Sequence, residues 1–299
     1  MSDKWPPEYD RNFFPQPDAR YWDPDVETMD SAERTRKIIL PKLQALLQYA
    51  YQNSPFYRRK WDQAGIAPQD ICSLEDFEQI PFVTKEEIRQ DQAQNPPFGS
   101  NLCVPKNEIG LVHGTSGTTG KPTAFGVGKG DIDRIANAHA RIMWSFGVRQ
   151  DDVVFIASFF SLYWGSWGAL LGAERLGATA FPFGAGVAGQ SDRALEWMKE
   201  VRPTVFYGTP SYSLYLAEKA KAKGLDPRKD FNFRILFFSG EPGAGVPSTK
   251  KRIETTYGGI CIDSGSTAEM TPWMTNCECE QRQGMHLWQD IVYSELVDV

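Results

Sequence analysis

The chain has 299 residues, of which 41% are hydrophobic and 23% charged, a composition that allows a folded protein with a substantial core. Its net charge of −6 makes a nucleic-acid backbone a poor partner. No apolar run is long enough to span a membrane, and the amino terminus has no apolar signal core, so neither a membrane partner nor secretion is expected. An odd number of cysteines, five, favours a reducing compartment, which we take to be the cytoplasm.

The first hundred residues are predicted to be mostly helical. The stretch before Asp30 is rich in proline, aspartate and aromatic residues and is typical of an extended strap over a surface. Apolar residues then recur at helical spacing, and Asp30 with Glu33 resembles an N-terminal helix cap. Thr84 with Glu87 forms the capping-box pattern of a further helix. We therefore expect residues 1–100 to form a helical region packed on the core.

From residue 101 to residue 299 the pattern changes to short β-branched and aromatic runs separated by helical stretches. The runs are "DVVFIASFF", "ATAFPF", "PTVFYG", "FRILFFSG" and "GGICIDSG", and the helical stretches are 131–146, 166–176, 191–201, 211–223 and 247–256. Apolar strands alternating with helices predict an α/β fold with a mostly parallel sheet flanked by helices. Ligands of such sheets bind beyond the carboxyl ends of the strands, where "YGTPS", "SGEPG" and "DSGSTAE" fall.

The stretch "HGTSGTTGKPT" (113–123) is rich in glycine and hydroxyl groups and carries one ammonium, on Lys121. Free backbone N–H groups, hydroxyls and a positive charge suit an anion, and phosphate is the obvious one. A Walker loop, and with it a P-loop kinase or NTPase, is disfavoured. Thr115 stands at the first glycine position of that motif, and Pro122 replaces its magnesium-binding Ser or Thr. Pro122 also disfavours a helix directly after the loop, and a solvated linker is the other alternative.

These motifs resemble those of the adenylate-forming acyl-CoA ligases, and most closely those of the phenylacetate-CoA ligase branch. Thr115 to Thr123 match the family's phosphate loop, close to S-S-G-T-T-G-K-P-T, at nearly every position. "NSPFYRRKWDQAGI", "GALLGAERLGATAFPF" and "ILFFSGEPG" look like other stretches of that branch. The resemblance implies the N-terminal domain of an adenylate-forming enzyme. Such an enzyme joins a carboxylic acid to AMP, using ATP and magnesium, and then passes the acyl group to the thiol of coenzyme A.

The resemblance also implies roles for particular residues. Lys121 holds the β and γ phosphates together with Thr115, Ser116, Gly117, Thr118, Thr119 and Gly120. Glu269 matches the acidic magnesium ligand, with Thr267 or Ser266 in the hydroxyl role beside it. The nucleotide segments are Ser239, Gly240, Glu241, Pro242, Asp263, Ser264, Gly265 and Ser266. The acid pocket is assigned to Tyr163, Trp164, Gly165, Trp167, Gly208, Thr209 and Pro210.

Two departures from the family pattern bear on function. "SGSTAE" lacks the aromatic residue that stacks on adenine, which keeps a non-catalytic nucleotide-binding module of the same fold as an alternative. Tyr163, Trp164 and Trp167 occupy a stretch that is glycine-rich in phenylacetate ligases. If one of these rings lines the pocket, a smaller acid follows, and we prefer a short branched or hydroxylated acid, as used by a 2-hydroxyacyl-CoA ligase branch. An aryl acid stays open, because Trp and Tyr also pack against rings.

Three further expectations concern the last part of the chain. Cys277, Cys279 and His286, with Cys261, form a partial pattern for structural zinc, and the alternative is a reduced, metal-free loop. Lys250 and Lys251, on an expected helix, are interpreted as a solvated pair. The chain stops at "YSELVDV", which we expect to lie within a strand, so that the core is incomplete and the family's C-terminal lid is absent. The expected partners are a small carboxylic acid, ATP and coenzyme A, and a homodimer is left open.

Overall fold

The structure is a computed structural model that describes residues 10–115, 122–162, 164–185, 189–270 and 274–297. The chain divides into two compact units. Unit 1 is Met1–Asp10 with Pro24–Arg134, and unit 2 is Arg11–Asp23 with Ile135–Val299. The division therefore falls inside helix α7 (Asp131–Ser145) and differs from the boundary that we expected at residue 100.

Unit 1 is mostly helical over its first part, as the sequence predicted. Its helices are α1 (Pro24–Glu27), α2 (Ser31–Arg34), α3 (Leu40–Asn53), α4 (Pro55–Ala64), α5 (Leu74–Phe77) and α6 (Lys85–Gln94). A π-helical turn, η1 (Thr35–Ile39), leads into α3, and the 3-10 turns η2 (Pro68–Asp70) and η3 (Lys106–Glu108) lie in the connections. The side chain of Asp30 caps α2, and Thr84 and Glu87 form the predicted capping box of α6.

A two-stranded hairpin lies in the last part of unit 1, directly before α7. Strands β1 (Ile109–Gly114) and β2 (Ala124–Gly128) pair antiparallel, with Gly114 opposite Ala124. The glycine-rich stretch connects them, and a strand rather than a helix follows it. This arrangement confirms the expectation drawn from Pro122 and differs from a Walker loop, which leads into a helix.

Unit 2 contains the mostly parallel sheet that the apolar runs predicted. Its strands are β3 (Val153–Ile156), β4 (Thr179–Phe181), β5 (Val205–Gly208), β6 (Ile235–Phe238), β7 (Ile260–Gly265), β8 (Asn276–Glu278) and β9 (Met285–Leu287). In the described residues they form one sheet in the order β4-β3-β5-β6-β7-β8-β9. The first five of these are mutually parallel, whereas β8 and β9 are antiparallel additions.

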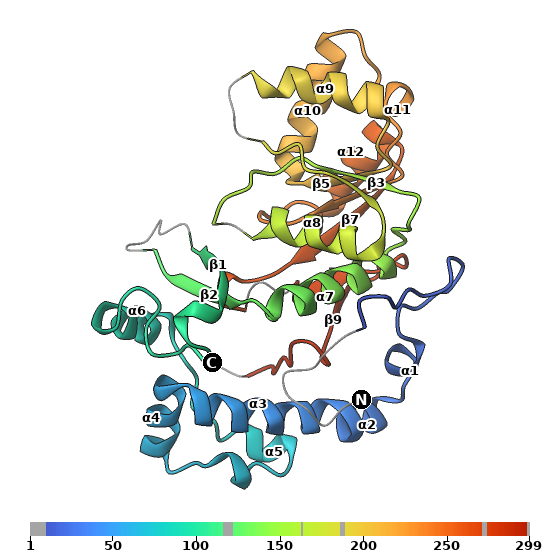
Figure 1. The fold of residues 1–299 in the computed structure, drawn as a ribbon. Coiled ribbons are helices and arrows are strands. Elements are labelled where there is room, and N and C mark those ends of the chain that lie inside the picture. The colour runs from blue at the N-terminus through green and yellow to red at the C-terminus, as the bar shows by residue number, and fades with distance from the viewer. Residues whose placement is uncertain (1–9, 116–121, 163, 186–188, 271–273, 298–299) are drawn as a thin grey trace. The chain divides into compact units, whose positions relative to one another are not determined.

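Helices cover both faces of this sheet because alternate residues of each strand point to opposite sides. Val205 and Tyr207 join one buried cluster with residues of α7 and α8 (Gly165–Leu176). Phe206 joins a second cluster with residues of α9 (Gln190–Val201), α10 (Pro210–Ala222) and α12 (Pro247–Tyr257). Figure 1 shows these two groups of helices on opposite sides of the strands. A further short helix, α11 (Pro227–Asp230), precedes β6.

The part of the predicted strap that belongs to unit 2 is Arg11–Asp23, whereas Pro24–Glu27 form helix α1. Trp22 is buried and packs edge-on against Trp144, with ring centroids 5.8 Å apart. The Trp144 indole N–H also donates to the Ala19 carbonyl at 3.0 Å. The strap therefore covers part of the apolar cluster to which Trp144 belongs.

Residues 293–297 correct one expectation. The sequence suggested that the chain stops within a strand, but no strand includes these residues, and Leu296 is 98% exposed. A strand needs a neighbour to pair its backbone groups, and the apolar spacing of "YSELV" does not supply one. Among the described helices, none combines the length and the apolar character needed to cross a bilayer.

Candidate functional site

The strand order of unit 2 creates a topological switch point between β3 and β5. Strand β3 pairs with β4 on one side and with β5 on the other, while α8 and α9 pack on opposite faces of the sheet. Ligands of open α/β sheets bind beyond the carboxyl ends of the strands at such a point. The two segments that leave this point begin at Ala157 and Thr209. They lead into the two turns to which the sequence assigned the acid pocket.

Gly208 allows the ends of β3 and β5 to approach closely. A Cβ at this position would lie 3.0 Å from the Ala157 carbonyl oxygen, while the Ala157 N–H donates to Tyr207 at 2.7 Å. Thr209 follows as the N-cap of α10, where its hydroxyl accepts from the Tyr212 N–H, and Pro210 occupies the first helical position. This predicted pocket segment is therefore a rigid strand-to-helix turn.

The two tryptophans of the predicted acid pocket have different environments. Trp164 is only 3% exposed, directly before Gly165 begins α8. Trp167 is partly exposed. Its indole N–H donates to the Ser161 carbonyl at 3.0 Å, and its ring meets Phe160 edge-on at 5.1 Å. Trp167 thus holds the segment after β3 in place, whereas Trp164 is a buried ring. Tyr163, the third aromatic residue of the assignment, lies outside the described residues.

The segment after β6, which the resemblance assigns to the nucleotide, is held by two side-chain bonds. The Ser239 and Tyr207 hydroxyls lie 2.7 Å apart, and a carboxylate oxygen of Glu241 accepts from the Ser211 N–H at 2.7 Å. Ser211 lies in the first turn of α10, where the helix dipole favours a carboxylate. Glu241 thereby fixes the turn that contains Gly240 and Pro242.

At the end of β7, the residues predicted to bind the nucleotide alternate between the core and the opposite face of the sheet. Ser264 is 4% exposed and its hydroxyl donates to the Phe238 carbonyl at 2.8 Å, so its side chain supports the strand ends rather than a ligand. Asp263 and Gly265 alternate with it and point to the other face. A Cβ on Gly245 would lie 2.5 Å from a carboxylate oxygen of Asp263. The Asp263 side chain therefore lies directly over the loop that follows β6.

An ion pair that sequence reasoning missed supports Asp263. The Lys250 ammonium lies 2.6 Å from both carboxylate oxygens of Glu278, and the side chains are 17% and 8% exposed. Glu278 also accepts from the Asp263 N–H at 2.8 Å. The interpretation of Lys250 as solvated was wrong, because its partner lies 28 residues away on β8, whereas Lys251 is exposed. Burial, and then the nearby Glu278 carboxylate, raise the pKa of Asp263 above its usual value.

The predicted magnesium ligand lies just beyond β7. Glu269 is exposed in the 3-10 turn η4 (Ala268–Met270), and Ser266 and Thr267 are exposed before it. The Met270 N–H donates to the Thr267 carbonyl at 3.2 Å, which closes the turn. Glu269 is therefore placed at the same edge of the sheet as the other strand-end segments, with Thr267 and Ser266 both accessible.

The predicted phosphate residues belong to unit 1, at the hairpin. Ser116 to Lys121 lie outside the described residues, and Thr115 and Thr123 are the described positions nearest to them. The Thr115 hydroxyl accepts from the Thr123 N–H, and the Thr123 carbonyl accepts from the Thr115 N–H, both at 3.1 Å. These two bonds close the base of the glycine-rich stretch.

The four predicted zinc ligands do not form a metal-binding group. Cys277 is buried, and His286 faces it across the β8–β9 pair but is exposed and packs against Trp288. Cys261 is buried in the second cluster, whereas Cys277 belongs to the first, and Cys279 lies beyond the end of β8. In the part of the chain that the structure describes, no three His, Cys, Asp or Glu side chains are grouped to hold a metal. These residues therefore do not fit the four-ligand zinc site.

Comparison with known proteins identifies a family and close relatives. Residues 58–291 match the AMP-binding enzyme family. The phenylacetate-coenzyme A ligase of Pseudomonas putida is 34% identical over 288 residues, which are 96% of this chain and 63% of that protein. The phenylacetate-coenzyme A ligase of Thermus thermophilus is 33% identical over 278 residues, 93% of this chain and 60% of that protein. The chain thus spans about three fifths of the length of these relatives.

Crystal structures of a 2-hydroxyisobutyryl-CoA ligase are more similar still. An open conformation in complex with 2-HIB-AMP and CoA is 54% identical, has a TM-score of 0.94, and is matched over 99% of this chain and 63% of that chain. The same ligase in its thioesterification state, with 2-HIB-AMP and CoA, is 56% identical with a TM-score of 0.95. It is matched over 99% of this chain and 62% of that chain.

Proposed function

The chain belongs to the AMP-binding enzyme family. We propose that it acts as the N-terminal part of an AMP-forming acyl-CoA ligase that activates a small hydroxylated carboxylic acid. The observation that carries this proposal is its 54% identity, over 99% of its length, to a ligase crystallised with 2-HIB-AMP and CoA. The phenylacetate-CoA ligases are less similar, at 34% and 33% identity. A hydroxylated aliphatic acid is therefore favoured over an aryl acid.

The proposed reaction has two steps. In the first, a carboxylate oxygen of the acid attacks the α-phosphorus of ATP. The bond from that phosphorus to the β-phosphate bridging oxygen breaks, and pyrophosphate leaves with its electron pair. In the second, the thiol of coenzyme A loses its proton and attacks the acyl carbonyl, and AMP leaves as the thioester forms. Because phosphoryl chemistry depends on position and charge, the protein's contribution is to align the acid with ATP and to stabilise negative charge.

Each group of described residues has a place in this reaction. The turns after β3 and β5, with Trp167, Gly208 and Thr209, would take the acid, because they meet at the switch point of the sheet. The segment after β6, fixed by Glu241, and the carboxylate of Asp263 would hold the adenosine. Lys121 and the glycine-rich stretch, of which residues 116–121 lie outside the described residues, would hold the β and γ phosphates, as the resemblance implies.

Magnesium fits the residues present better than zinc does. Magnesium in nucleotide sites is bound by one or two carboxylates together with phosphate oxygens and water, so one exposed glutamate is sufficient. Glu269 would hold it, with the hydroxyl of Thr267 or Ser266 beside it. When bound, the ion neutralises charge on the phosphates of ATP.

Measuring products with the purified chain, supplemented with the C-terminal lid domain that the family resemblance implies, tests the proposal. MgATP is supplied with 2-hydroxyisobutyrate, with phenylacetate or with no acid, and pyrophosphate, AMP and ADP are quantified in each case. We expect pyrophosphate and AMP to form in equal amounts, faster with the hydroxylated acid than with phenylacetate. Addition of coenzyme A should convert the acyl-adenylate to the thioester.

Three outcomes would contradict the proposal in different ways. Faster turnover of phenylacetate would overturn the choice of acid alone. ADP and phosphate without AMP would point to an ordinary NTPase. Nucleotide binding without acid-dependent pyrophosphate release would favour the non-catalytic module, which the missing adenine-stacking aromatic of "SGSTAE" also suggests.

A further inference from the structure

The amide side chain of Gln92, in the last turn of α6, is hydrogen-bonded to the backbone of β2. Gln92 is 8% exposed. Its NH₂ group donates to the Ala124 carbonyl at 2.6 Å, and its carbonyl oxygen accepts from the Ala124 N–H at 3.2 Å. One side chain thus satisfies both backbone groups of a single strand residue, in the way that a neighbouring strand would.

Those two bonds complete a pattern at the base of the glycine-rich stretch. Backbone groups of successive strand residues point to opposite edges. The N–H and carbonyl of Thr123 bond to Thr115 on the β1 side, at 3.1 Å each. The groups of Ala124 point to the other edge, where Gln92 meets them. The chain segment that leaves the glycine-rich stretch is therefore held on one edge by Thr115 and on the other by Gln92.

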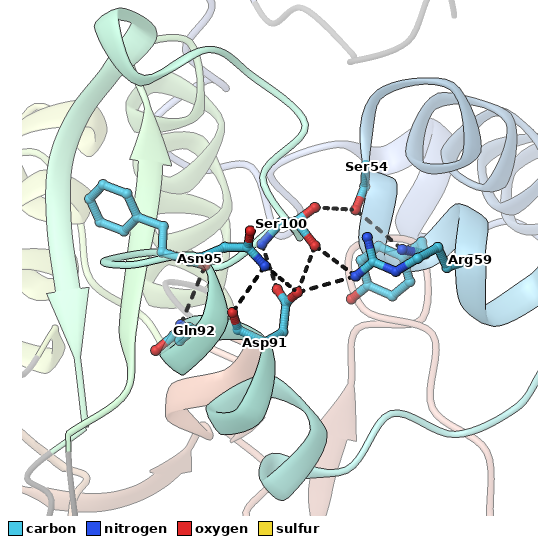
Figure 2. A network of polar contacts seen from close by, with 8 residues as sticks. Ser54, Arg59, Asp91, Gln92, Asn95 and Ser100 are labelled. Atoms are coloured by element: carbon cyan, nitrogen blue, oxygen red, sulfur yellow. Dashed lines mark hydrogen bonds and ion pairs between the residues drawn. The ribbon is translucent and has the colours of Figure 1, made fainter.

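A buried carboxylate next to Gln92 fixes the turn from which it projects. Asp91 accepts from the Ser100 hydroxyl at 2.6 Å, from Arg59 at 3.2 Å and from the Asn95 side chain at 3.3 Å, and also from the Ser100 N–H. Figure 2 shows these bonds converging on Asp91, with Gln92 beside it. Gly99 has a φ of +79°, and a Cβ there would lie 2.4 Å from Asp91 and 3.2 Å from Gln92. The backbone turn from which Gln92 projects is thus fixed by bonds that do not involve the hairpin.

We propose that Gln92 is a positioning residue for the phosphates of ATP. By holding Ala124, it fixes where the glycine-rich stretch leaves β2, three residues after Lys121. The inference rests on the proposed function, which assigns the β and γ phosphates to that stretch and the adenosine to the strand ends of unit 2. Gln92 touches neither the nucleotide nor the reacting atoms in this account; it acts through the backbone of Ala124.

The assignment predicts a difference between two nucleotides. ATP carries the β and γ phosphates, whereas AMP has only the α phosphate together with the same adenine and ribose. Loss of the two Gln92 hydrogen bonds should therefore weaken the binding of ATP and leave the binding of AMP almost unchanged. A purely structural role would instead lower the stability of unit 1 without changing the ratio of the two dissociation constants.

Calorimetric titration of MgATP and AMP into the wild type and Gln92→Met tests this difference. Methionine has a similar length and removes both hydrogen bonds, and Gln92→Ala is the second variant in case Met packs in an altered position. Leaving the groups of Ala124 unpaired should raise the Kd for MgATP about tenfold and change the Kd for AMP by less than about twofold. Gln90→Met is the matched control, because Gln90 is exposed on the same helix and bonds to Glu86.

The outcomes separate the inference from the function on which it rests. If the wild type binds neither MgATP nor AMP, both are overturned. A second outcome is that the wild type binds both nucleotides while the Gln92 variants weaken the binding of both equally, or of neither. In that case the positioning role of Gln92 is overturned and the proposed function stands. A selective loss of MgATP in Gln92→Met, absent in Gln90→Met, supports the role.

Discussion

In unit 2 the polar turns follow strands that are paired on both sides, whereas in unit 1 the glycine-rich stretch joins two strands that, in the part of the chain the structure describes, pair only with each other. Strand β6 has β5 and β7 as neighbours, and strand β7 has β6 and β8. Among the described residues, β1 and β2 form a sheet of two strands, and the outer edge of β2 at Ala124 is met by the side chain of Gln92.

This difference shows how each region fixes the turns to which the proposed function assigns ligands. In unit 2 the sheet itself sets the positions of the strand ends, and single side chains such as Glu241 and Ser264 only adjust the turns. In unit 1 the side chain of Gln92 takes the place of a neighbouring strand at Ala124, so the course of β2 at that point depends on a small number of residues. If the proposed function holds, substitutions in the hairpin should affect the β and γ phosphates, and substitutions at the strand ends should affect the acid, the adenosine and the magnesium ion.

The largest effect should follow removal of one charge from each region. We expect Lys121→Ala and Glu269→Gln each to lower the rate of acyl-adenylate formation about a hundredfold or more, because pre-organised charges contribute that much in such sites. The measurement is acid-dependent pyrophosphate release. Lys129→Ala removes an exposed charge at the end of the same hairpin and should have little effect. Near-normal pyrophosphate release in either variant would mean that the site has been misassigned.

A large effect on stability should follow loss of one partner of the Lys250–Glu278 pair. Removing one member leaves a mostly buried charge without its partner, so Lys250→Met should lower the free energy of unfolding by about 3 kcal/mol. Urea denaturation measures this loss. Lys251→Met is the matched control on the same helix, and at an exposed position it should change stability by less than about 0.5 kcal/mol. Equal values for the two variants would contradict the role of the pair.

A moderate effect on acid preference should follow Trp167→Gly. The ring holds the segment after β3 at the switch point, so its removal should widen the acid pocket. The ratio of kcat/KM for a larger acid, such as phenylacetate, to that for the small acid should then rise by the equivalent of about 1–3 kcal/mol. Trp164→Gly is the comparison, because that ring is buried and its loss should lower stability instead. An unchanged ratio of kcat/KM for the two acids in Trp167→Gly would place this ring outside the pocket.

The smallest effect, a pH-dependent change in melting temperature, should follow Asp263→Asn. The folded state raises the pKa of Asp263 and therefore binds its proton more tightly than the unfolded state does. The contribution of this carboxyl to the stability of the fold consequently falls as the pH rises through the pKa of the folded state. At pH 7 the asparagine variant should melt at a slightly higher temperature than the wild type. The difference should narrow as the pH falls toward about 4, the ordinary pKa of an aspartate. A lower melting temperature at pH 7 would contradict this.

Sequence alone predicted the five parallel strands of unit 2 because most of them are short apolar runs buried on both faces. "FRILFFSG", for example, contains β6, with Leu236 and Phe237 buried on opposite sides. Sequence alone did not predict β8 and β9, which lack such a run. It could not predict partners chosen by the fold. The interpretation of Lys250 as solvated failed because its partner Glu278 lies on another element. The sequence carries no signal for the role of Gln92, because its partner is a backbone residue 32 positions away. The zinc pattern failed for the same reason, since spacing along the chain did not place Cys261 and Cys277 in one cluster.

Hydrogen exchange with each nucleotide tests most directly the division of labour between the hairpin and the strand ends. The purified protein is labelled alone, with AMP and with MgATP, and exchange is followed in peptides from 109–128, 239–246 and 260–270. We predict that AMP slows exchange only in the two strand-end peptides, whereas MgATP also slows it in the hairpin peptide. Slowing of the hairpin by AMP as strongly as by MgATP, or no slowing there by MgATP, would contradict the account.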